Sequence, residues 1–203
     1  TAEIDSVDRI PELVRRAFQI ATSGRQGPIV LSLPEDVLSD LSDIDDLRSV
    51  TAAAAAPAPA EIAAAMAMLA EAKRPLVIVG GSGWTEISAE ALRDFVERNG
   101  LPVVSSFRRQ DILDNQHANY VGHLSLATSK TLAARIADAD VIFALGARLS
   151  DVTTRGYTLL TAPRGHSKLI HAYAEPDEIG RVFDADIRIV GSVGRVAQAL
   201  AAV

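Results

Sequence analysis

The sequence predicts an α/β fold, a doubly wound parallel sheet of the Rossmann-like type, preceded by an N-terminal helix-strand segment. The first observation is a set of short, almost wholly apolar runs at 76–79, 141–145, 169–172 and 187–190, which alternate with stretches of helical spacing. Strands without polar alternation are buried on both faces, as they are in a parallel sheet between helices. The second observation is that glycine-rich loops follow two of these runs, at the strand ends where such sheets bind ligands.

The first block of the chain predicts one helix followed by one strand. Pro11 suits the first helical turn, where its missing N–H is not needed. Five apolar residues then recur at helical spacing and form one stripe, before Ser23 and Gly24 end the helix: Leu13, Val14, Ala17, Phe18 and Ala21. The branched apolar run at 29–33, which Pro34 ends, predicts a buried strand.

Residues 38–58 predict a linker. Four aspartates without periodicity lead into five consecutive alanines and then into the prolines at 57 and 59. Such a stretch buries little surface and favours extended backbone near its prolines. The predicted organisation is therefore an N-terminal segment at 1–37, a linker at 38–58 and a Rossmann-like domain at 59–203.

From residue 59 onward, predicted helices and strands alternate regularly. Helices are expected near 60–72, at 88–99 with Gly100 as the C-terminal signal, and near 128–137. A strand begins at 102–104, and the residues between it and the third helix predict a long loop that contains His117 and His123. No internal repeat interrupts this order, so one doubly wound domain accounts for it.

The composition argues against several classes of function. The chain carries a formal net charge of −6 and its basic residues are scattered, which argues against a nucleic-acid partner. It has no cysteine, and its four histidines do not gather at metal-ligand spacing, so no metal site is predicted. No apolar run reaches the roughly 20 residues of a membrane span, and the start of the chain lacks a signal-peptide pattern. We therefore expect a cytoplasmic protein, and Thr1 in place of Met suggests a piece of a longer chain.

Two loops at predicted strand ends are candidates for ligand binding. The stretch 80–83 (Gly-Gly-Ser-Gly) offers backbone N–H groups to a phosphate, but it is not a full G-x-G-x-x-G motif, so a simple tight turn is an open alternative. In the second loop, at 146–151, Arg148 could pair with a diphosphate, hold Asp151, or form an ordinary surface ion pair. After the strand at 102–104 the chain has serines rather than an acid, which counts against a simple NAD site.

Four stretches, in order, resemble thiamine-diphosphate-dependent enzymes of the acetolactate synthase large-subunit type. Residues 25–37 look like the G-P-V-x-L-x-x-P-x-D-V signature that closes the pyrimidine-binding domain of that family. Residues 73–81 resemble the opening of its central domain, and 139–148 resemble its A-D-x-x-x-x-x-G-x-R segment. Residues 168–180 resemble its K-x-I-x-I-D-x-D-P-x-E-I-G segment. The resemblance therefore implies the C-terminal tail of the pyrimidine-binding domain at 1–37 and a central domain of the DHS-like NAD/FAD-binding type at 59–203.

The resemblance also implies which parts of an enzyme lie elsewhere. The family's catalytic glutamate lies upstream, and its metal-diphosphate G-D-G motif lies downstream in a third domain; no G-D-G occurs here. Thiamine diphosphate and Mg²⁺ are therefore expected outside this chain, and the chain alone is expected to have no catalytic residue and no activity. The whole enzyme is expected to be a homo-oligomer, a dimer or tetramer, that acts as a lyase or transferase (a decarboxylase or carboligase) on a 2-oxo acid. The partners of this chain would be the pyrimidine- and diphosphate-binding domains of the same polypeptide.

In acetolactate synthase-like members the central domain holds FAD in a structural role, whereas other members hold ADP or no nucleotide there. By resemblance, the cofactor-binding residues of this chain are Gly80, Gly81, Ser82, Ser105, Ser106, Phe107, Val121, Gly122, His123, Gly146, Arg148 and Asp151. Four positions depart from the FAD-binding pattern: Ser150, Val152, Tyr173 and Ser192. FAD, another nucleotide and an empty pocket therefore all remain open.

Two other classes of protein also remain open. A stand-alone nucleotide-binding module, such as an electron-transfer flavoprotein-like or a sirtuin-like domain, shares the predicted fold. The lack of cysteine disfavours the sirtuin type, which needs a zinc module, and the N-terminal helix-strand unit has no role in the flavoprotein type. A scaffold without a ligand is the remaining alternative.

Overall fold

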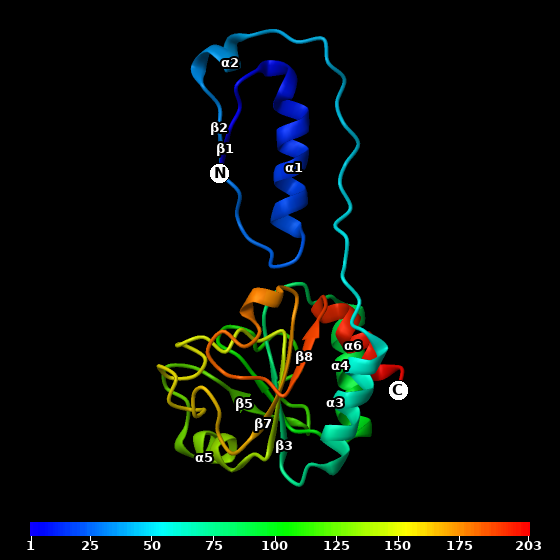
Figure 1. Ribbon diagram of the computed structural model, residues 1–203, viewed down its shortest axis with the longest axis vertical. Helices are drawn as coiled ribbons and strands as arrows, with labels where there is room; N and C mark the ends of the chain where they lie inside the picture. Colours follow the sequence, from blue (N-terminus) through cyan, green and yellow to red (C-terminus); the bar gives the residue numbers. More distant parts are fainter. The chain divides into compact units, whose positions relative to one another are not determined.

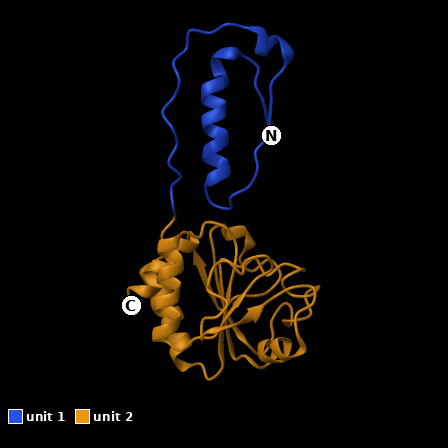
Figure 2. Ribbon diagram, turned by 180° about the vertical axis from the view of Figure 1, so that it is seen from behind, with its two compact units in different colours: residues 1–54 blue, residues 55–203 orange.

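The computed structural model describes residues 1–203, which form two compact units (Figures 1 and 2). Unit 1 is Thr1–Ala54 and unit 2 is Ala55–Val203. The division falls within the stretch at 38–58 that the sequence predicts as a linker, and no helix or strand occurs between α2, which ends at Ser39, and α3, which begins at Pro59. The assignment of residues 1–37 to a preceding domain stays a prediction.

Unit 1 contains the predicted helix and a smaller strand than predicted. Its elements are β1 (Ala2–Glu3), η1 (Val7–Arg9), α1 (Ile10–Thr22), β2 (Leu31–Ser32) and α2 (Glu35–Ser39), and β1 pairs with β2 in parallel. The prediction of a buried strand at 29–33 is wrong in this structure, because only two residues are in a strand and Val30 is 61% exposed. The apolar stripe of α1 is only partly covered, since Leu13 is 7% exposed but Phe18 is 64% exposed. A two-stranded sheet with one long helix and two short helical segments provides too few layers to bury both faces of a strand.

Unit 2 contains a six-stranded parallel sheet, which confirms the predicted doubly wound α/β fold. Its strands are β3 (Pro75–Val79), β4 (Val103–Ser105), β5 (Tyr120–His123), β6 (Val141–Leu145), β7 (Lys168–Tyr173) and β8 (Ile187–Val190). The strand order is β5-β4-β3-β6-β7-β8. The chain therefore builds outward from β3 to one edge, returns to the centre, and builds outward from β6 to the other edge. The order reverses between β3 and β6, which pair along their full lengths.

The helices of unit 2 begin where local sequence signals place them. They are α3 (Pro59–Glu71), α4 (Glu86–Arg98), α5 (Lys130–Asp138) and α6 (Val193–Ala201), with a short 3₁₀ turn η2 at Pro176–Glu178. Pro59 occupies the first turn of α3, where no N–H is needed. The hydroxyls of Thr85 and Ser129 accept from the backbone N–H groups of Ser88 and Leu132, which caps α4 and α5. None of the helices combines the length and apolar character that crossing a bilayer requires.

One element of unit 2 contradicts the sequence-based expectation. The predicted long loop is wrong at 120–123, because Val121, Gly122 and His123 lie in the edge strand β5 and not in a loop. There Gly122 and His123 pair with Val104 and Ser105 of β4, with an irregularity in the register. Without β5, the backbone groups on that side of β4 would have no strand partner. The four residues are at most half-buried and include a glycine, so they lack the apolar run that marks the inner strands.

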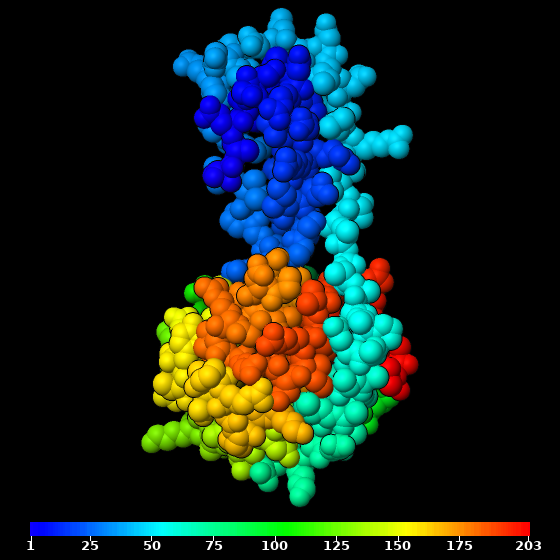
Figure 3. All heavy atoms as spheres, in the orientation of Figure 1, coloured from blue at the N-terminus to red at the C-terminus, as the bar shows by residue number.

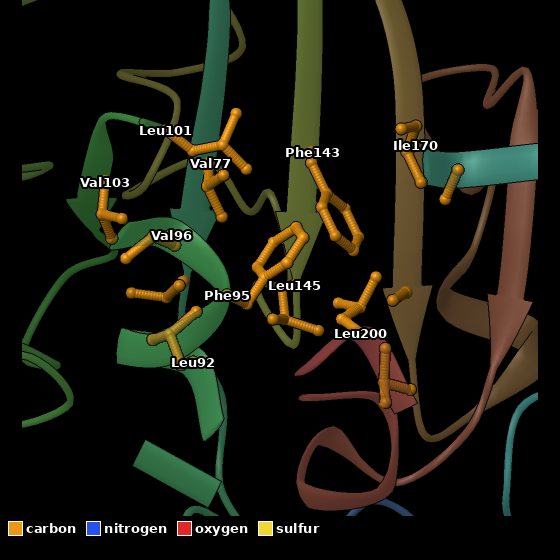
Figure 4. Close-up of a cluster of buried hydrophobic side chains, with 14 of the residues drawn as sticks. Val77, Leu92, Phe95, Val96, Leu101, Val103, Phe143, Leu145, Ile170 and Leu200 are labelled. Atoms are coloured by element: carbon orange, nitrogen blue, oxygen red, sulfur yellow. The ribbon is translucent and has the colours of Figure 1, made fainter. Parts of the chain in front are cut away.

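The two faces of the sheet are covered in different ways. The helix-covered face is packed by α3, α4 and α6, which lie together on one side of the sheet (Figure 1). Figure 4 shows the centre of this packing, where Phe95 of α4 and Leu200 of α6 lie against Phe143 and Leu145 of β6. The opposite, loop-covered face is packed by α5 and by two crossovers without an α-helix, at 146–167 and 174–186. In the space-filling view these crossovers, coloured yellow to orange, form a broad part of the surface of unit 2 (Figure 3).

Candidate functional site

The carboxyl ends of β3 and β6 meet at the point where the strand order reverses. In open α/β sheets, ligands bind in the crevice that this reversal opens. The structure places the loop at 80–83 and the loop at 146–151 side by side there, since the N–H of Gly80 donates to Leu145 O (3.1 Å). The predicted residues that follow β4 lie on the neighbouring strand, and those of β5 on the next one. The twelve predicted cofactor-binding residues therefore fall along one edge of the sheet, over β5, β4, β3 and β6 and the turn after β6; their role as contacts stays a prediction.

The glycines at this edge are required by the packing of the chain against itself. A Cβ atom at Gly80 would lie 2.2 Å from Ser106 Oγ, and one at Gly81 would lie 2.2 Å from Gly146 O. Gly81 and Gly146 also have positive φ values of 74° and 70°, a conformation that L side chains rarely adopt. The indole N–H of Trp84 donates to Gly80 O (2.8 Å), which holds the loop over the end of β3. The tight-turn interpretation of these glycines therefore has direct geometric support.

Ser105, the last residue of β4, and Ser106, which follows it, are both buried. Ser105 and Ser106 are 1% and 6% exposed. Ser105 Oγ lies 2.9 Å from the hydroxyl of Tyr120, so β4 and β5 are joined by a side-chain hydrogen bond. Ser106 packs against Gly80. Ser105 Oγ is thus used within the fold and Ser106 is buried, whereas Ser82 and His123 are exposed along the same edge.

A cavity of about 110 Å³ opens one strand further along, between the segments that follow β6 and β7. Its wall includes basic, acidic and hydroxyl side chains as well as apolar ones. Those with polar groups are Arg148, Ser150, Asp151, Tyr157, His171, Glu178 and Arg181. Two predicted residues, Arg148 and Asp151, therefore line a real hollow at the predicted edge.

An ion pair orders the cavity wall. Arg148 Nε lies 3.1 Å from Glu178 Oε1, and Arg181 Nη1 lies 3.6 Å from the other carboxylate oxygen. The Glu178 side chain is only 7% exposed, while that of Arg148 is 40% exposed. The suggestion that Arg148 holds Asp151 is wrong, because its acidic partner is Glu178, thirty positions further along the chain. Glu178 therefore holds the Nε side of the Arg148 guanidinium, while part of the Arg148 side chain stays exposed to solvent.

His171 of β7 forms the inner end of the cavity. Its ring is buried, and its Nε2 lies 3.0 Å from Ala147 O, a distance that fits an N–H donating to the carbonyl. Burial lowers the pKa of His171, although the hydrogen bond to Ala147 and the nearby Glu178 carboxylate oppose this shift. His171 is thus a neutral donor at neutral pH and not a second fixed cation.

Sequence reasoning missed Glu178, Arg181 and His171 as members of this site. The segment at 168–180 is part of the family resemblance, so its general importance was visible. However, Glu175, Asp177 and Glu178 are similar acids in one short stretch, and only the turn η2 decides that the third is buried beneath Arg148. No group of three or more His, Asp or Glu side chains gathers anywhere in the chain at metal-binding distance.

Comparison with known proteins identifies the family. The sequence profile described as the thiamine pyrophosphate enzyme, central domain, matches residues 62–200, which is most of unit 2. The chain belongs to this family. This confirms the resemblance that the motifs carry. The cavity of about 110 Å³ at the carboxyl ends of the strands therefore lies within a thiamine pyrophosphate enzyme central domain.

Several relatives are acetolactate synthases. The chain is 26% identical over 197 residues to the acetolactate synthase isozyme 2 large subunit of Escherichia coli, covering 97% of this chain and 35% of that protein. It is 33% identical over 197 residues to the acetolactate synthase of Mycobacterium leprae, covering 93% and 30%. It is 32% identical over 208 residues to a probable acetolactate synthase large subunit of Methanocaldococcus jannaschii, covering 98% and 34%. The chain thus spans about a third of the length of these relatives.

A solved structure shares the fold. It is that of an enzyme from Mycobacterium smegmatis described as thiamin diphosphate-dependent, with a TM-score of 0.72 and 21% identity. The match covers 98% of this chain and 38% of that one. At this identity the likeness speaks for the fold and not for a ligand.

Proposed function

We propose that this chain is the central part of a thiamine-diphosphate-dependent decarboxylase or carboligase that acts on 2-oxo acids. The observation that carries the proposal is the family match over 62–200 together with relatives named acetolactate synthase. In this proposal thiamine diphosphate and Mg²⁺ are held by the pyrimidine- and diphosphate-binding domains, in a cytoplasmic homo-oligomer. The donor set of this chain supports that division, since it has no G-D-G sequence and no cluster of acids or histidines that could hold the metal.

Within the whole enzyme, we infer that this central domain is structural and also holds a nucleotide at the carboxyl edge of the sheet. When bound, FAD or ADP would be a charged ligand that contacts the strand-end loops and holds them together. The cavity of about 110 Å³ is smaller than the ~300–1,000 Å³ of sites for drug-sized ligands, so it suits the phosphates and not the ring systems. Arg148, held from behind by Glu178, is the residue placed to bind a phosphate.

The predicted FAD contacts fit this proposal only in part. Ser82 and His123 are accessible at the same edge, and Asp151 lies on the cavity rim. The side chains of Ser105 and Ser106 are buried, and the Ser105 hydroxyl is hydrogen-bonded to that of Tyr120, so these serines support the loops and do not offer exposed contacts. A nucleotide would therefore be held through Arg148 and backbone N–H groups more than through serine hydroxyls.

The enzymatic part of the proposal is tested on the protein expressed from the complete reading frame. With thiamine diphosphate and Mg²⁺, that protein is expected to release carbon dioxide from a 2-oxo acid such as pyruvate. The 203-residue chain, under the same conditions, is expected to release none. A complete reading frame without a downstream G-D-G motif, or activity in the 203-residue chain, would contradict the proposal and favour a stand-alone module.

The nucleotide part is tested by titrating the 203-residue chain with ADP and with FAD in a calorimeter. Arg148→Met, which keeps the apolar stem, is expected to weaken binding about tenfold, or ~1.4 kcal/mol. Arg155→Met is the matched control, because Arg155 is an exposed arginine in the same crossover but does not line the cavity. If neither nucleotide binds, or if both variants lose affinity equally, the carboxyl-edge site is not a nucleotide site.

A further inference from the structure

A second cavity lies at the opposite, amino edge of the same sheet. It has a volume of about 170 Å³ and opens between the end of α5, the first residues of β7 and the crossover at 146–167. The strand ends that bind ligands in this fold class are the carboxyl ends, so the nucleotide site proposed above does not account for this cavity. Its volume is far above the ~10–15 Å³ that one water needs and below that of a drug-sized site, so it suits a ligand of a few carbon atoms.

The floor of this amino-edge cavity is apolar. It is formed by buried side chains from three parts of unit 2, namely Ile136 of α5, Leu169 of β7 and Phe183 of the second crossover. These side chains belong to the core beneath the loop-covered face. A hydrocarbon group that enters the cavity would replace water on this surface, which favours its binding.

The rim is held in place by contacts within the protein. Arg164 Nη2 lies 2.7 Å from Asp184 Oδ2, and Arg164 Nη1 lies 3.1 Å from Asp186 Oδ1. The N–H of Asp184 donates to Pro163 O (2.7 Å), and Ser167 Oγ donates to Ala139 O (2.7 Å). The two crossovers and the end of α5 are thus tied together around the opening. The cavity is therefore a built feature of the fold that needs no ligand to form.

The opening has one cation that enters no ion pair, because the carboxylates of Asp184 and Asp186 are already paired with arginines. Asp184 is the acidic residue of the lining, and it is already paired with Arg164 and with Arg188. Lys168, the first residue of β7, is exposed, lines the cavity and enters no ion pair. His166, two residues before Lys168, lines the same cavity. A cation beside an apolar floor is the arrangement that recognises an anion with a hydrocarbon body.

We propose that the amino-edge cavity binds a small aliphatic carboxylate, with its hydrocarbon against Ile136, Leu169 and Phe183 and its carboxylate at Lys168. This proposal does not depend on the nucleotide site or on the activity of the whole enzyme. The proposed ligand would bind on the loop-covered face, at the amino ends of the strands and therefore at the opposite end from the carboxyl edge.

The test uses the 203-residue chain with isotope-labelled Ile and Leu methyl groups, observed by NMR. The probe is 3-methylbutanoate, and 3-methylbutanamide is its neutral counterpart of the same shape. The carboxylate is expected to shift the methyl signals of Ile136 and Leu169 with saturation below about 10 mM, and the amide is expected to bind at least about tenfold more weakly. Equal shifts by acid and amide, or none from the acid, would overturn the assignment.

Two variants, each with a matched control, separate this cavity from binding elsewhere. Lys168→Met is expected to remove the preference for the acid, whereas Lys130→Met, at an exposed lysine outside the cavity, is expected to keep it. Ala137→Phe places a ring at the opening and is expected to abolish the shifts, whereas Ala134→Phe, on the same helix but outside the cavity, is expected to leave them. Both alanines are exposed, so the fold is expected to survive either change. If Ala137→Phe binds the acid as well as the unchanged chain does, the ligand lies elsewhere and the proposal fails.

Discussion

The two faces of the sheet in unit 2 are covered differently, by packed helices on one side and by irregular crossovers with cavities on the other. On the helix-covered face, α3, α4 and α6 bury an apolar core in which residues such as Phe95 and Leu200 are wholly inaccessible. On the loop-covered face, α5 is the only α-helix, and irregular crossovers supply the rest of the cover. Both cavities described above open beside the crossover at 146–167.

The difference follows from what a helix and an irregular segment can each bury. A helix presents a continuous apolar stripe that fills the grooves of a neighbouring helix or sheet. An irregular crossover turns repeatedly, satisfies its own backbone, and contributes apolar side chains only at intervals such as Leu149 and Phe183. Hollows with polar rims are therefore left on that face. Four comparisons between the faces test this view, from the largest expected effect to the smallest.

The largest effect is expected from Phe95→Ala, on the helix-covered face. This change is expected to lower the free energy of unfolding by about 3–5 kcal/mol, because a closed core cannot collapse around the space left behind. Phe183→Ala, beside the amino-edge cavity, is expected to lose less, because the crossover can relax and water can enter. Urea titration followed by fluorescence of Trp84, the only tryptophan, reports on unit 2 alone. An equal or larger loss for Phe183→Ala would contradict the contrast between the faces.

The second comparison uses two glycines with similar backbone angles. Gly146 has φ of 70° and Gly156 has φ of 65°, so alanine at either position carries about 1–2 kcal/mol of backbone strain. At Gly146 the new Cβ would also lie 2.6 Å from Gly80 O and 2.9 Å from Val193 Cγ2 of α6, whereas at Gly156 it meets nothing within 4 Å. Gly146→Ala is therefore expected to destabilise unit 2 clearly more in the same urea titration. Similar losses would mean that the strand-end loops can move apart without penalty.

The third comparison concerns the buried acid of the loop-covered face. Glu178→Gln removes the charge that pairs with Arg148 and Arg181, and we expect a loss of roughly 1–2 kcal/mol in unfolding free energy. This value lies between the ~0–1 kcal/mol of exposed pairs and the 3–5 kcal/mol of fully buried ones, because both arginines are partly in water. Asp177→Asn, at the exposed neighbouring acid, is expected to change stability by less than about 0.5 kcal/mol. If the two changes have equal effects, Glu178 does not order the cavity wall.

The smallest effect is a dependence of stability on pH that comes from His171. Its folded pKa lies below its ordinary value of 6.5, so the unfolded chain binds more protons and stability is lost as the pH falls below about 6.5. The contribution is at most about 1.4 kcal/mol for each unit by which the pKa is lowered. Melting temperatures measured between about pH 7.5 and 5.5 are expected to fall less in His171→Gln than in the unchanged chain.

The control for this change is His123→Gln, at an exposed histidine of β5, which is expected to keep the full pH dependence. Carboxylates whose pKa is lowered, such as Asp111 and Asp184 beside their arginines, lose their contribution only in a more acidic range, below their ordinary value of 3.8. A pH dependence unchanged in His171→Gln would show that the buried ring is not its source.

The inner strands could be predicted because their sequences are apolar throughout. The runs at 76–79 and 141–145 agree with the inner strands β3 and β6 to within a residue at each end. The edge strand β5 could not be predicted, since a half-exposed strand with a glycine differs little from a loop until β4 lies beside it. The prediction of a buried strand at 29–33 failed for the opposite reason, because the two-stranded sheet of unit 1 is too small to bury its apolar sequence.

The position of the candidate site could be predicted from the sequence, but the contacts between its side chains could not. Glycines and Arg148 directly after predicted strands marked the carboxyl edge, because strand direction alone places them there. The pairing of Arg148 with Glu178 links two crossovers, and no local pattern encodes such a distance. The burial of Ser105 likewise depends on Tyr120 from a different strand.

The sequence by itself determined the family, the alternation of strands and helices and the edge of the sheet where the candidate site lies, since these follow from local pattern and motif. Only the tertiary structure decided which polar groups face solvent and which are used by the fold, and where the loop-covered face leaves space. The physical reason is that burial and hollow volume belong to the contacts between segments and not to any one segment. The glycine loops that first marked a nucleotide site prove to hold the strand ends together, and the partly exposed charge beside them is that of Arg148, which the buried Glu178 holds in place.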